Sequence, residues 1–447
     1  MKSLSADIAK KQVNLSPPSL LALGFLSFIV IGTLLLMLPV SHHGDLAWMD
    51  AWFTAVSAVT ITGLSTVVLN DTYTLFGQFV VLLLIQCGGL GFMTFAILAA
   101  LSLSPTLRLR QQKMAQDSMG QTSLGSVHFV AQGVLFYTLF FELLGMIILT
   151  LAWLPEYGFS HALYYGLFYS ISAFNNAGFS LFPDGLISYQ THYLICLTIS
   201  LLYMIGGLGF IVLMDIKRQK RWRKLSVNSR LVLMTIAALN LFGFLMIWLL
   251  EAGNTATLAN LSMSEQALSA WVQATVPRSS GFNTINTGEM TSASTLLTMV
   301  LMFIGGGSLS TAGGIKVGTF IVLVLSVIAF LRRQDEVRIM NYAISTENTL
   351  KALAVTVITI LLIFMGLFCL LVLEPEQDFM NVLFEVVSAA CTVGLSRGIT
   401  SELSSGSLFI LTLLMFTGRL GPLTLAYLIA TPNKTRIKHP STTIHVG

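Results

Sequence analysis

The stretch SAFNNAGFS, residues 172–180, lies between two long apolar segments of the chain. Its centre is polar, contains a glycine and carries no charge. A loop in water normally carries charged residues, whereas polar side chains are rare in a helix that faces lipid. Irregular polar backbone is tolerated at membrane depth where it lines water or is buried in protein. The stretch therefore predicts backbone that lines a water-filled path inside a membrane protein.

The composition of the whole chain supports a membrane protein. Of its 447 residues, 55% are hydrophobic and only 10% are charged, whereas a soluble protein carries about a quarter charged residues. After a basic start, the run from Leu20 to Val40 is long enough to span and has no small-residue cleavage site, so we expect it to remain as a helix. The four cysteines lack metal-ligand spacing and are interpreted as buried thiols.

Long apolar runs alternate with shorter ones along the chain. The long runs cover residues 19–40, 73–103, 128–154, 190–214, 229–250, 293–331, 350–373 and 406–430. Each can cross a bilayer, while the intervening stretches, about 10–14 residues long, suit re-entrant half-helices. Twenty of the 24 lysines and arginines lie in or near the tails and loops on the side of the membrane opposite the half-helices. The positive-inside rule then places both termini in the cytoplasm.

This pattern predicts an all-α polytopic membrane protein with four span–pore-helix–span repeats. Eight transmembrane helices and four re-entrant half-helices would surround one central pore. The expected repeats are residues 1–120 with a cytoplasmic N-terminal tail, 121–225, 226–345 with an intramembrane loop, and 346–447 with a cytoplasmic C-terminal tail.

The four half-helix regions align without gaps. They read FTAVSAVTITGLS (53–65), FYSISAFNNAGFS (168–180), WVQATVPRSSGFN (271–283) and FEVVSAACTVGLS (384–396). In each, an aromatic residue stands ten positions before a glycine and a small hydroxyl residue stands six before it. A second glycine follows 24 to 28 residues later, at Gly88, Gly206, Gly305 and Gly418. Four matches in one register favour a true internal repeat.

Four parallel repeats around an axis along the membrane normal would place one glycine stretch in each quadrant of a pore. Glycine adopts the left-handed conformation readily, so successive carbonyls can face one side. A ring of carbonyls replaces the hydration shell of a monovalent cation, and the negative ends of the short helices favour that cation. The predicted filter residues are Ile61, Thr62, Gly63, Asn176, Ala177, Gly178, Ser279, Ser280, Gly281, Thr392, Val393 and Gly394.

The sixth apolar run contains GGGSLSTAGGIKVGT (305–319), with six glycines in fifteen residues. Each glycine costs a helix about 1 kcal/mol, which favours a break in the span. Close helix packing through small residues is the alternative. A loop here would lie below the filter and could obstruct the pore. The predicted gating residues are Gly305, Gly306, Gly307, Ser308, Ser310, Thr311, Gly313, Gly314, Lys316 and Arg419.

Two of these residues are cations inside apolar segments, where a charge is costly and usually faces a cavity or a partner. Arg419 either faces the pore or anchors neighbouring carbonyls, and Lys316 is favoured as an anchor. Glu142, inside the third span, is a candidate partner for either cation.

With these motifs and GRLGPLTLAY (418–427), the whole chain resembles the Ktr/Trk/HKT superfamily of potassium transport proteins, most closely the bacterial Ktr membrane subunit. The resemblance implies potassium uptake across the cytoplasmic (inner) membrane of a bacterium, with potassium at the filter carbonyls, no covalent cofactor and, often, stimulation by sodium. It also implies a homodimer with one pore per subunit, and a cytosolic nucleotide-binding ring that gates it. Glycine in all four stretches goes with potassium selectivity in this superfamily. The second glycine and the tyrosine of TVGYG filters are absent here, so selectivity is expected to be less strict.

Two other functions were weighed. A secondary transporter for a small organic solute would use broken helices, inverted repeats and an ionisable pocket. An intramembrane enzyme would need paired catalytic groups, and the seven histidines show no such arrangement. No GxxxxGK[ST] motif occurs, so nucleotide would act through a separate subunit. The basic segment RQKRWRK (218–224) sets topology, binds acidic membrane lipid or contacts a partner; no nucleic-acid partner is expected.

Overall fold

The computed structural model describes residues 17–91, 124–308, 310–340 and 342–421 of the chain. The expected cytoplasmic tails and the basic inner loop at 108–113 lie outside these residues. The main helices are α2 (Pro17–Leu36), α3 (Trp48–Thr60), α4 (Leu69–Thr72), α5 (Leu75–Leu90), α8 (Leu124–Phe174), α9 (Tyr193–Leu208), α10 (Phe210–Gln219), α11 (Val227–Glu251), α12 (Met263–Thr275), α13 (Ser292–Phe303), α14 (Val317–Leu331), α15 (Thr346–Leu373), α16 (Phe379–Ala390) and α17 (Ser405–Leu420).

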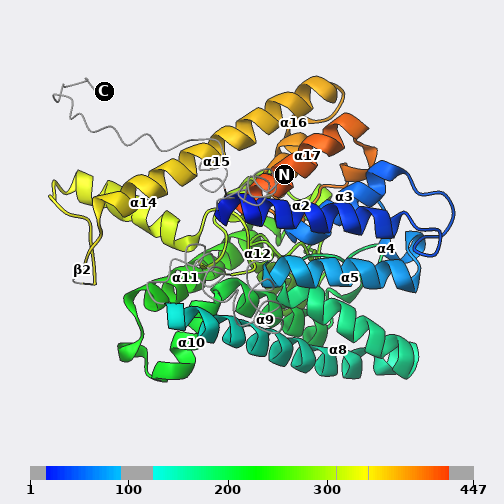
Figure 1. Ribbon diagram of the computed structural model, residues 1–447, viewed down its shortest axis with the longest axis horizontal. Helices are drawn as coiled ribbons and strands as arrows, with labels where there is room; N and C mark the ends of the chain where they lie inside the picture. The colour runs from blue at the N-terminus through cyan, green and yellow to red at the C-terminus, as the bar shows by residue number, and fades with distance from the viewer. Residues whose placement is uncertain (1–16, 92–123, 309, 341, 422–447) are drawn as a thin grey trace, which may run out of the picture.

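The remaining elements are short. They are the 3₁₀ turns η2 (Ile187–Tyr189), η3 (Trp222–Lys224), η4 (Thr287–Glu289) and η5 (Thr400–Glu402), and the strands β1 (Arg338–Ile339) and β2 (Tyr342–Ala343). The two strands pair antiparallel, and in Figure 1 they project from the end of α14. Regular structure in the described part of the chain is therefore almost entirely helical.

Each predicted repeat contains a short helix that ends at its glycine stretch. In three repeats this is a separate helix, α3, α12 or α16. In the second repeat it is the end of α8, which is merged with the preceding span across a kink at Gly158, where φ is 71° and ψ is 172°. Proline at position 155 removes a helix hydrogen-bond donor just before the kink.

The second helix of each repeat ends close to the glycine that the alignment placed 24 to 28 residues further on. Three such helices stop at glycines with positive φ, namely Gly91 (71°), Gly209 (95°) and Gly421 (85°). In the second repeat, α9 and α10 meet there at an angle of 93°. The sequence predicted a break only in the third repeat, so the bend between α9 and α10 corrects that expectation; the residues after Gly91 and Gly421 lie outside the described chain.

Judged by length and apolar composition, fewer of the described helices can cross a bilayer than the eight that the sequence predicts. Among the described residues, three helices are long and apolar enough to cross a bilayer, Gln132–Phe174, Val227–Glu251 and Thr346–Leu373. The bent pair α9 and α10 would make a fourth. Shorter apolar helices occupy other expected positions, among them Ala22–Leu36, Leu75–Leu90, Ser292–Phe303, Val317–Leu331 and Ser405–Leu420. The chain is thus a multi-pass membrane protein, and the count of eight spans remains a prediction.

The repeats are arranged as a closed ring. The helix α5 packs against α8, α9 against α12, α13 against α16, and α17 against α3. These contacts join the first repeat to the second, the second to the third, the third to the fourth, and the fourth back to the first. Figure 1 shows the last contact, with α17 beside α3 although they lie at opposite ends of the chain.

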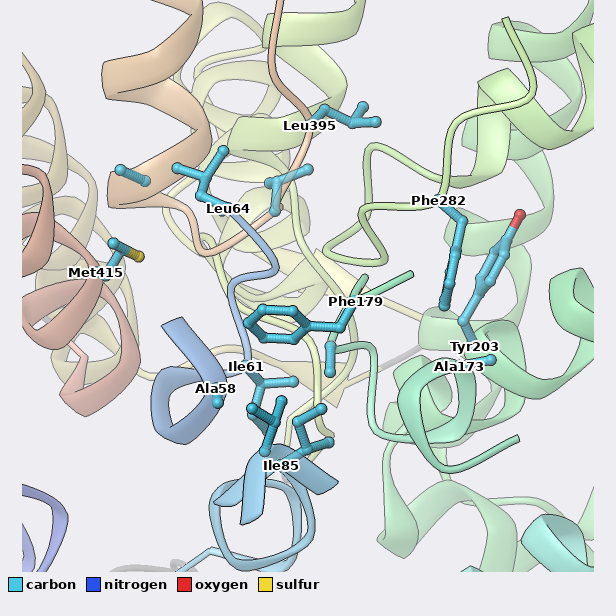
Figure 2. Packing of buried hydrophobic residues seen from close by; sticks show 14 of the residues in the cluster. Ala58, Ile61, Leu64, Ile85, Ala173, Phe179, Tyr203, Phe282, Leu395 and Met415 are labelled. Carbon is cyan, nitrogen blue, oxygen red and sulfur yellow. The ribbon is translucent and has the colours of Figure 1, made fainter. Parts of the chain in front are cut away.

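The core of this ring consists of the short helices and the loops that follow them. Figure 2 shows Phe179 near Ile61 and Ile85, while Phe282 lies beside Tyr203; these residues and Leu395 belong to one buried cluster. Large apolar side chains such as Leu249, Phe330 and Phe368 are instead exposed on the outer helices. A protein with a buried polar centre and an apolar outer surface is suited to lipid.

Side-chain caps begin the second helix in three of the four repeats. The hydroxyl of Thr74 accepts from the backbone N–H of Gly77, that of Thr291 from Ser294, and that of Ser404 from Ser407. Each cap satisfies one of the free donors at the start of a helix. The repeat that the sequence shows in its glycine stretches therefore extends to the helix starts.

Candidate functional site

The four predicted filter stretches, residues 61–63, 176–178, 279–281 and 392–394, meet at one place in the centre of the ring. Their glycines all have positive φ, which is 91° at Gly63, 70° at Gly178, 70° at Gly281 and 90° at Gly394. Residues with a side chain rarely adopt this conformation. The backbone conformation therefore favours glycine at all four positions.

The glycines are also required by their neighbours, because there is no room for a side chain. An added Cβ would lie 2.4 Å from the Ala177 oxygen at Gly63, 2.8 Å from the Ser280 oxygen at Gly178, 3.2 Å from the Val393 oxygen at Gly281, and 2.1 Å from the Thr62 oxygen at Gly394. Each of these carbonyls belongs to the residue just before the glycine of the next repeat. The contacts run from repeat one to two, three, four and back to one, so carbonyl oxygens surround a common centre.

The residue two positions before each glycine is left-handed as well. The φ angles are 56° at Ile61, 58° at Asn176, 72° at Ser279 and 48° at Thr392. The residue between has no positive φ in any of the four stretches. The four aligned stretches thus share one backbone conformation, which a set of unrelated surface loops would not do.

The hydroxyl residue six positions before the glycine supports the stretch in two repeats. The Oγ of Ser57 accepts from the Gly63 N–H at 3.0 Å, and the Oγ of Ser388 accepts from the Gly394 N–H at 3.1 Å. In the second repeat the Ser172 hydroxyl donates instead to the Phe179 carbonyl at 2.9 Å. In the third, Thr275 bonds the Tyr203 hydroxyl at 2.6 Å. The four hydroxyl residues thus occupy the same aligned position but form different hydrogen bonds.

Several oxygen atoms of the filter stretches have no hydrogen-bond partner among the described residues. They are Asn176 Oδ1, Ser280 Oγ and Thr392 Oγ1, all on buried side chains. Buried polar atoms without a partner are rare and call for an explanation such as a bound ion or water.

A cavity of about 440 Å³, here called the outer cavity, lies against the four glycines on the side of the loops that follow them. Its walls are mainly the loops that follow the filter stretches, with hydroxyl and amide groups from Ser65, Asn283 and Ser396. Asp184 is the one acidic residue in its lining. The lining of this cavity is therefore mainly uncharged and polar.

The predicted gating segment, here called the loop 304–316, is a non-helical connection between α13 and α14. Its two ends are joined by a parallel bridge between Ile304 and Ile315, in which Gly305 N–H donates to the Ile315 oxygen at 2.9 Å. Further along, the Gly307 N–H donates to the Gly207 oxygen at 2.8 Å. The break predicted for the sixth span is thus present, and close packing in a continuous helix is excluded.

The loop 304–316 contacts the filter stretches from the side opposite the outer cavity. Asn176 Nδ2 donates to the Thr311 hydroxyl at 3.0 Å, and Gly313 N–H donates to the Ser279 hydroxyl at 2.7 Å. Ser279 in turn donates to the carbonyl of Thr392. An added Cβ at Gly313 would lie 1.9 Å from Thr392 Oγ1. The loop therefore lies against three of the four filter stretches.

The two intramembrane cations bind carbonyls of this loop. Arg419 donates to the Thr311 oxygen at 2.7 Å and to the Gly88 oxygen at 2.8 Å. Lys316 donates to the Ala312 oxygen at 2.5 Å. These contacts are those of an anchor. Glu142 is not the partner of either cation, because its carboxylate accepts from Gln86 and Asn175 instead.

The second glycines of the alignment are close-packing sites. An added Cβ would lie 2.1 Å from the Val59 oxygen at Gly88, 2.0 Å from the Phe174 oxygen at Gly206, and 2.2 Å from the Ala390 oxygen at Gly418. Each of these carbonyls lies four residues before a filter glycine. Gly305 differs, since its Cβ would meet the Gly313 oxygen at 1.8 Å. Three second glycines thus let the helix approach the filter stretch, and the fourth lets the loop fold on itself.

Sequence reasoning missed one residue that joins two repeats. Arg397, three residues after the last filter glycine, donates to the carbonyls of Thr287 at 2.9 Å and Gly288 at 2.8 Å. It also donates to Thr295 and Asn381. The sequence shows this arginine as a charge in a loop without indicating what it binds. Three of its four partners, Thr287, Gly288 and Thr295, lie more than a hundred residues away along the chain.

The fold and the site define a multi-pass helical membrane protein with four glycine stretches around one centre, as expected of a transporter for small ions. A family profile described as "TrkH: Cation transport protein" matches residues 17–439. The chain belongs to this family, whose members are ion transporters and not enzymes. The resemblance deduced from the sequence motifs is thereby confirmed.

Individual relatives cover nearly the full chain. It is 40% identical over 445 residues to the Ktr system potassium uptake protein B of Bacillus subtilis, covering 100% of both chains. It is 38% identical to the protein of the same name from Vibrio alginolyticus, covering 96% of this chain and 95% of the relative. The potassium/sodium uptake protein NtpJ of Enterococcus hirae is 32% identical, with 98% and 100% covered.

The fold is also similar to a solved structure. The crystal structure of the potassium transporter TrkH from Vibrio parahaemolyticus superposes with a TM-score of 0.75 at 19% identity, covering 94% of this chain and 86% of that one. This likeness shows that the two proteins share the fold.

Proposed function

We propose that the chain takes up potassium ions across the cytoplasmic membrane of a bacterium, through a filter formed by the four glycine stretches. The observation that carries this proposal is the closed circuit of glycines, in which each one lies against the carbonyl that precedes the next. Relatives named as potassium uptake proteins, similar over the full chain, support the same function.

The chemistry of the site suits a monovalent cation. The carbonyls of Thr62, Ala177, Ser280 and Val393 supply uncharged oxygen ligands from four directions. Such oxygens replace the water molecules around an ion without binding it so tightly that it cannot leave. The short helices point their partially negative C-terminal ends at the same centre. A cation is therefore stabilised there without a carboxylate in direct contact.

Sodium is proposed as a stimulating or competing ion. One relative is named as a potassium/sodium uptake protein, which favours a part for sodium in this group of proteins. The glycine in all four stretches favours potassium, while the short filter favours moderate selectivity. A transporter for an organic solute is disfavoured, since the chain belongs to a cation transport family and its central contacts leave little room for a larger molecule.

The loop 304–316 is proposed as the gate. It lies on the side of the filter away from the outer cavity, and its glycines make it a weak element of structure. Lys316 and Arg419 would hold it closed through the carbonyls of Ala312 and Thr311. Once the loop moves, the membrane potential can drive cations inward, at about 2.3 kcal/mol per elementary charge per 100 mV.

The working assembly is proposed as a homodimer with one pore per subunit, and with both termini in the cytoplasm. A separate cytosolic ring that binds nucleotide would regulate the gate. The name of the Bacillus relative, which assigns it to a Ktr system, supports a partner subunit. The division of the chain into four repeats at residues 120, 225 and 345 is part of the same proposal.

Ion flux into proteoliposomes tests the function. Vesicles that contain the purified chain should accumulate rubidium when the interior is made negative, and excess potassium should compete more strongly than excess sodium. Gly281→Ala should abolish this uptake, because the added Cβ would lie 2.7 Å from the Gly178 Cα. Gly253→Ala is the matched control, since no atom lies within 4 Å of its Cβ position. Uptake that is equal in both variants would reject the filter.

A further inference from the structure

A buried carboxylate lies beside the second filter stretch. Glu142, in the middle of α8, is only 6% exposed. Its Oε1 accepts from Asn175 Nδ2 at 2.8 Å, and its Oε2 accepts from Gln86 Nε2 at 3.1 Å. Gln86 Oε1 also accepts from Asn175 Nδ2, at 2.9 Å. The three side chains form one cluster that joins α5 of the first repeat to α8 and the filter stretch of the second.

The Glu142 carboxyl group accepts its hydrogen bonds from two amide nitrogens. Its Oε1 faces Asn175 Nδ2 and its Oε2 faces Gln86 Nε2, and an amide nitrogen can only donate. The ion pairs present among the described residues, Arg338–Glu336 and Lys351–Glu347, do not include Glu142. A carboxyl group without a cationic partner in the described chain thus lies buried in an apolar helix, where ionisable residues are rare and usually functional.

Asn175 connects this carboxyl group directly to the filter. It immediately precedes Asn176, the left-handed residue of the second stretch. It is 1% exposed, and its Oδ1 has no hydrogen-bond partner among the described residues. An added Cβ at Gly89 would lie 1.8 Å from that Oδ1, so α5 closes tightly over the asparagine. The position of the Asn175 amide is therefore set by Glu142, Gln86 and the Ile171 carbonyl on one side and by the α5 backbone on the other.

The second filter stretch lacks a hydrogen bond that stabilises the first and fourth stretches, so the contact with Glu142 matters more there. In the first and fourth repeats a serine hydroxyl accepts from the N–H of the filter glycine, whereas Ser172 donates to Phe179 instead. The residue three positions before the glycine also differs between repeats. It is Thr60, Asn175, Arg278 and Cys391 in turn. A carboxylate held by this residue is thus particular to one quadrant and does not follow from the fourfold pattern.

We propose that Glu142 is a positioning residue that sets ion preference through the second quadrant of the filter. Its carboxylate holds Asn175, and through it the backbone of residues 176–178, in the conformation that presents the Ala177 carbonyl to the centre. The inference rests on the proposed filter, and it adds a residue outside the four glycine stretches that governs selectivity.

The test compares rubidium uptake under sodium competition in proteoliposomes. Glu142→Gln replaces one acceptor oxygen with an amide N–H, which then faces one of the two donors. Loss of one hydrogen bond to a buried group predicts a fall of about tenfold in the preference for rubidium over sodium. Glu142→Asp keeps the carboxyl group and should retain more of the preference than Glu142→Gln.

An exchange of the two side-chain groups separates positioning from general stability. In the double variant Glu142→Gln with Asn175→Asp, the carboxylate moves to the other end of the same hydrogen bond, so selectivity should recover. Asn175→Asp alone would bring two carboxyl groups together. Its preference for rubidium over sodium should therefore be lower than that of Glu142→Gln or of the double variant. Glu251→Gln is the control, because Glu251 is a buried carboxylate bonded to Thr257, Asn254 and Thr291 with no contact to a filter stretch. It should leave ion preference unchanged.

Two results would overturn the inference. One is an unchanged rubidium preference in Glu142→Gln while Gly178→Ser, measured beside it, alters that preference. The other is loss of uptake in Glu142→Gln with unchanged preference and no recovery in the double variant, as expected of a purely structural glutamate. If Gly178→Ser and the other three glycine variants also leave preference unchanged, the filter itself fails, and this outcome is distinct from both.

Discussion

The hydroxyl of Thr311 offers a direct way to loosen the proposed gate. It accepts from Asn176 Nδ2 at 3.0 Å and donates to the Phe174 oxygen at 3.4 Å. Thr311→Val keeps the shape of the side chain and the Thr311 carbonyl that binds Arg419. The substitution removes the hydroxyl's two hydrogen bonds, to Asn176 of the second filter stretch and to Phe174 just before it. We therefore expect a change in the closed state with little change in packing.

The magnitude follows from the cost of leaving a buried donor unpaired. Asn176 is fully buried, and its Oδ1 already has no partner in the described chain. Removing the partner of its Nδ2 costs about 1–3 kcal/mol. If the bond exists only while the loop is closed, the ratio of open to closed loop rises by about 5- to 150-fold. Basal flux should rise accordingly, up to the limit at which the gate is always open.

The assay is rubidium uptake per milligram of reconstituted protein, without any cytosolic partner. Thr311→Val should exceed the wild type, and Thr311→Ser should equal it because serine keeps the hydroxyl. Thermal unfolding in detergent establishes that both variants are folded. Equal uptake in Thr311→Val and Thr311→Ser, or lower uptake in a folded Thr311→Val, would refute the reasoning that this bond holds the gate closed.

Three further predictions concern the anchor, the helix contacts and the partner. Arg419→Lys should raise basal rubidium uptake, because a lysine cannot keep both bonds to the Thr311 and Gly88 oxygens; uptake at the wild-type level would count against the anchor. Gly206→Ala should lower the unfolding temperature far more than Gly253→Ala, since its Cβ would lie 2.0 Å from the Phe174 oxygen, and equal temperatures would contradict the packing described. Affinity purification from the native membrane should recover a soluble nucleotide-binding subunit with the chain, and full nucleotide response by the chain alone would show that no such subunit is needed.

The four glycine stretches could be predicted from the sequence because their conformation depends on local chemistry. A backbone with positive φ requires glycine or tolerates few other residues, so Gly63 and its three counterparts are visible in any alignment of the repeats. The break at residues 305–314 was readable for a similar reason, since so many glycines weaken a helix. The family followed from these motifs together.

The parts that could not be predicted depend on contacts between distant segments. The partners of Arg419 are Thr311 and Gly88, which lie 108 and 331 residues away. Glu142 was considered as a partner for this arginine, yet it binds Asn175 and Gln86. The bend at Gly209 was missed because a few glycines in an apolar run are compatible with close helix packing.

The central claim is that the four glycine stretches form one cation filter. It is tested most directly by the ratio of rubidium to sodium uptake in proteoliposomes that contain the wild type or one of the variants Gly63→Ser, Gly178→Ser, Gly281→Ser and Gly394→Ser. Each serine would press on a filter carbonyl or Cα of the neighbouring stretch, within 2.1–2.8 Å of the Cβ position. The account predicts a lower ratio in every variant that still conducts, and the largest loss of uptake where the contact is shortest. A ratio equal to that of the wild type in all four folded variants would contradict it.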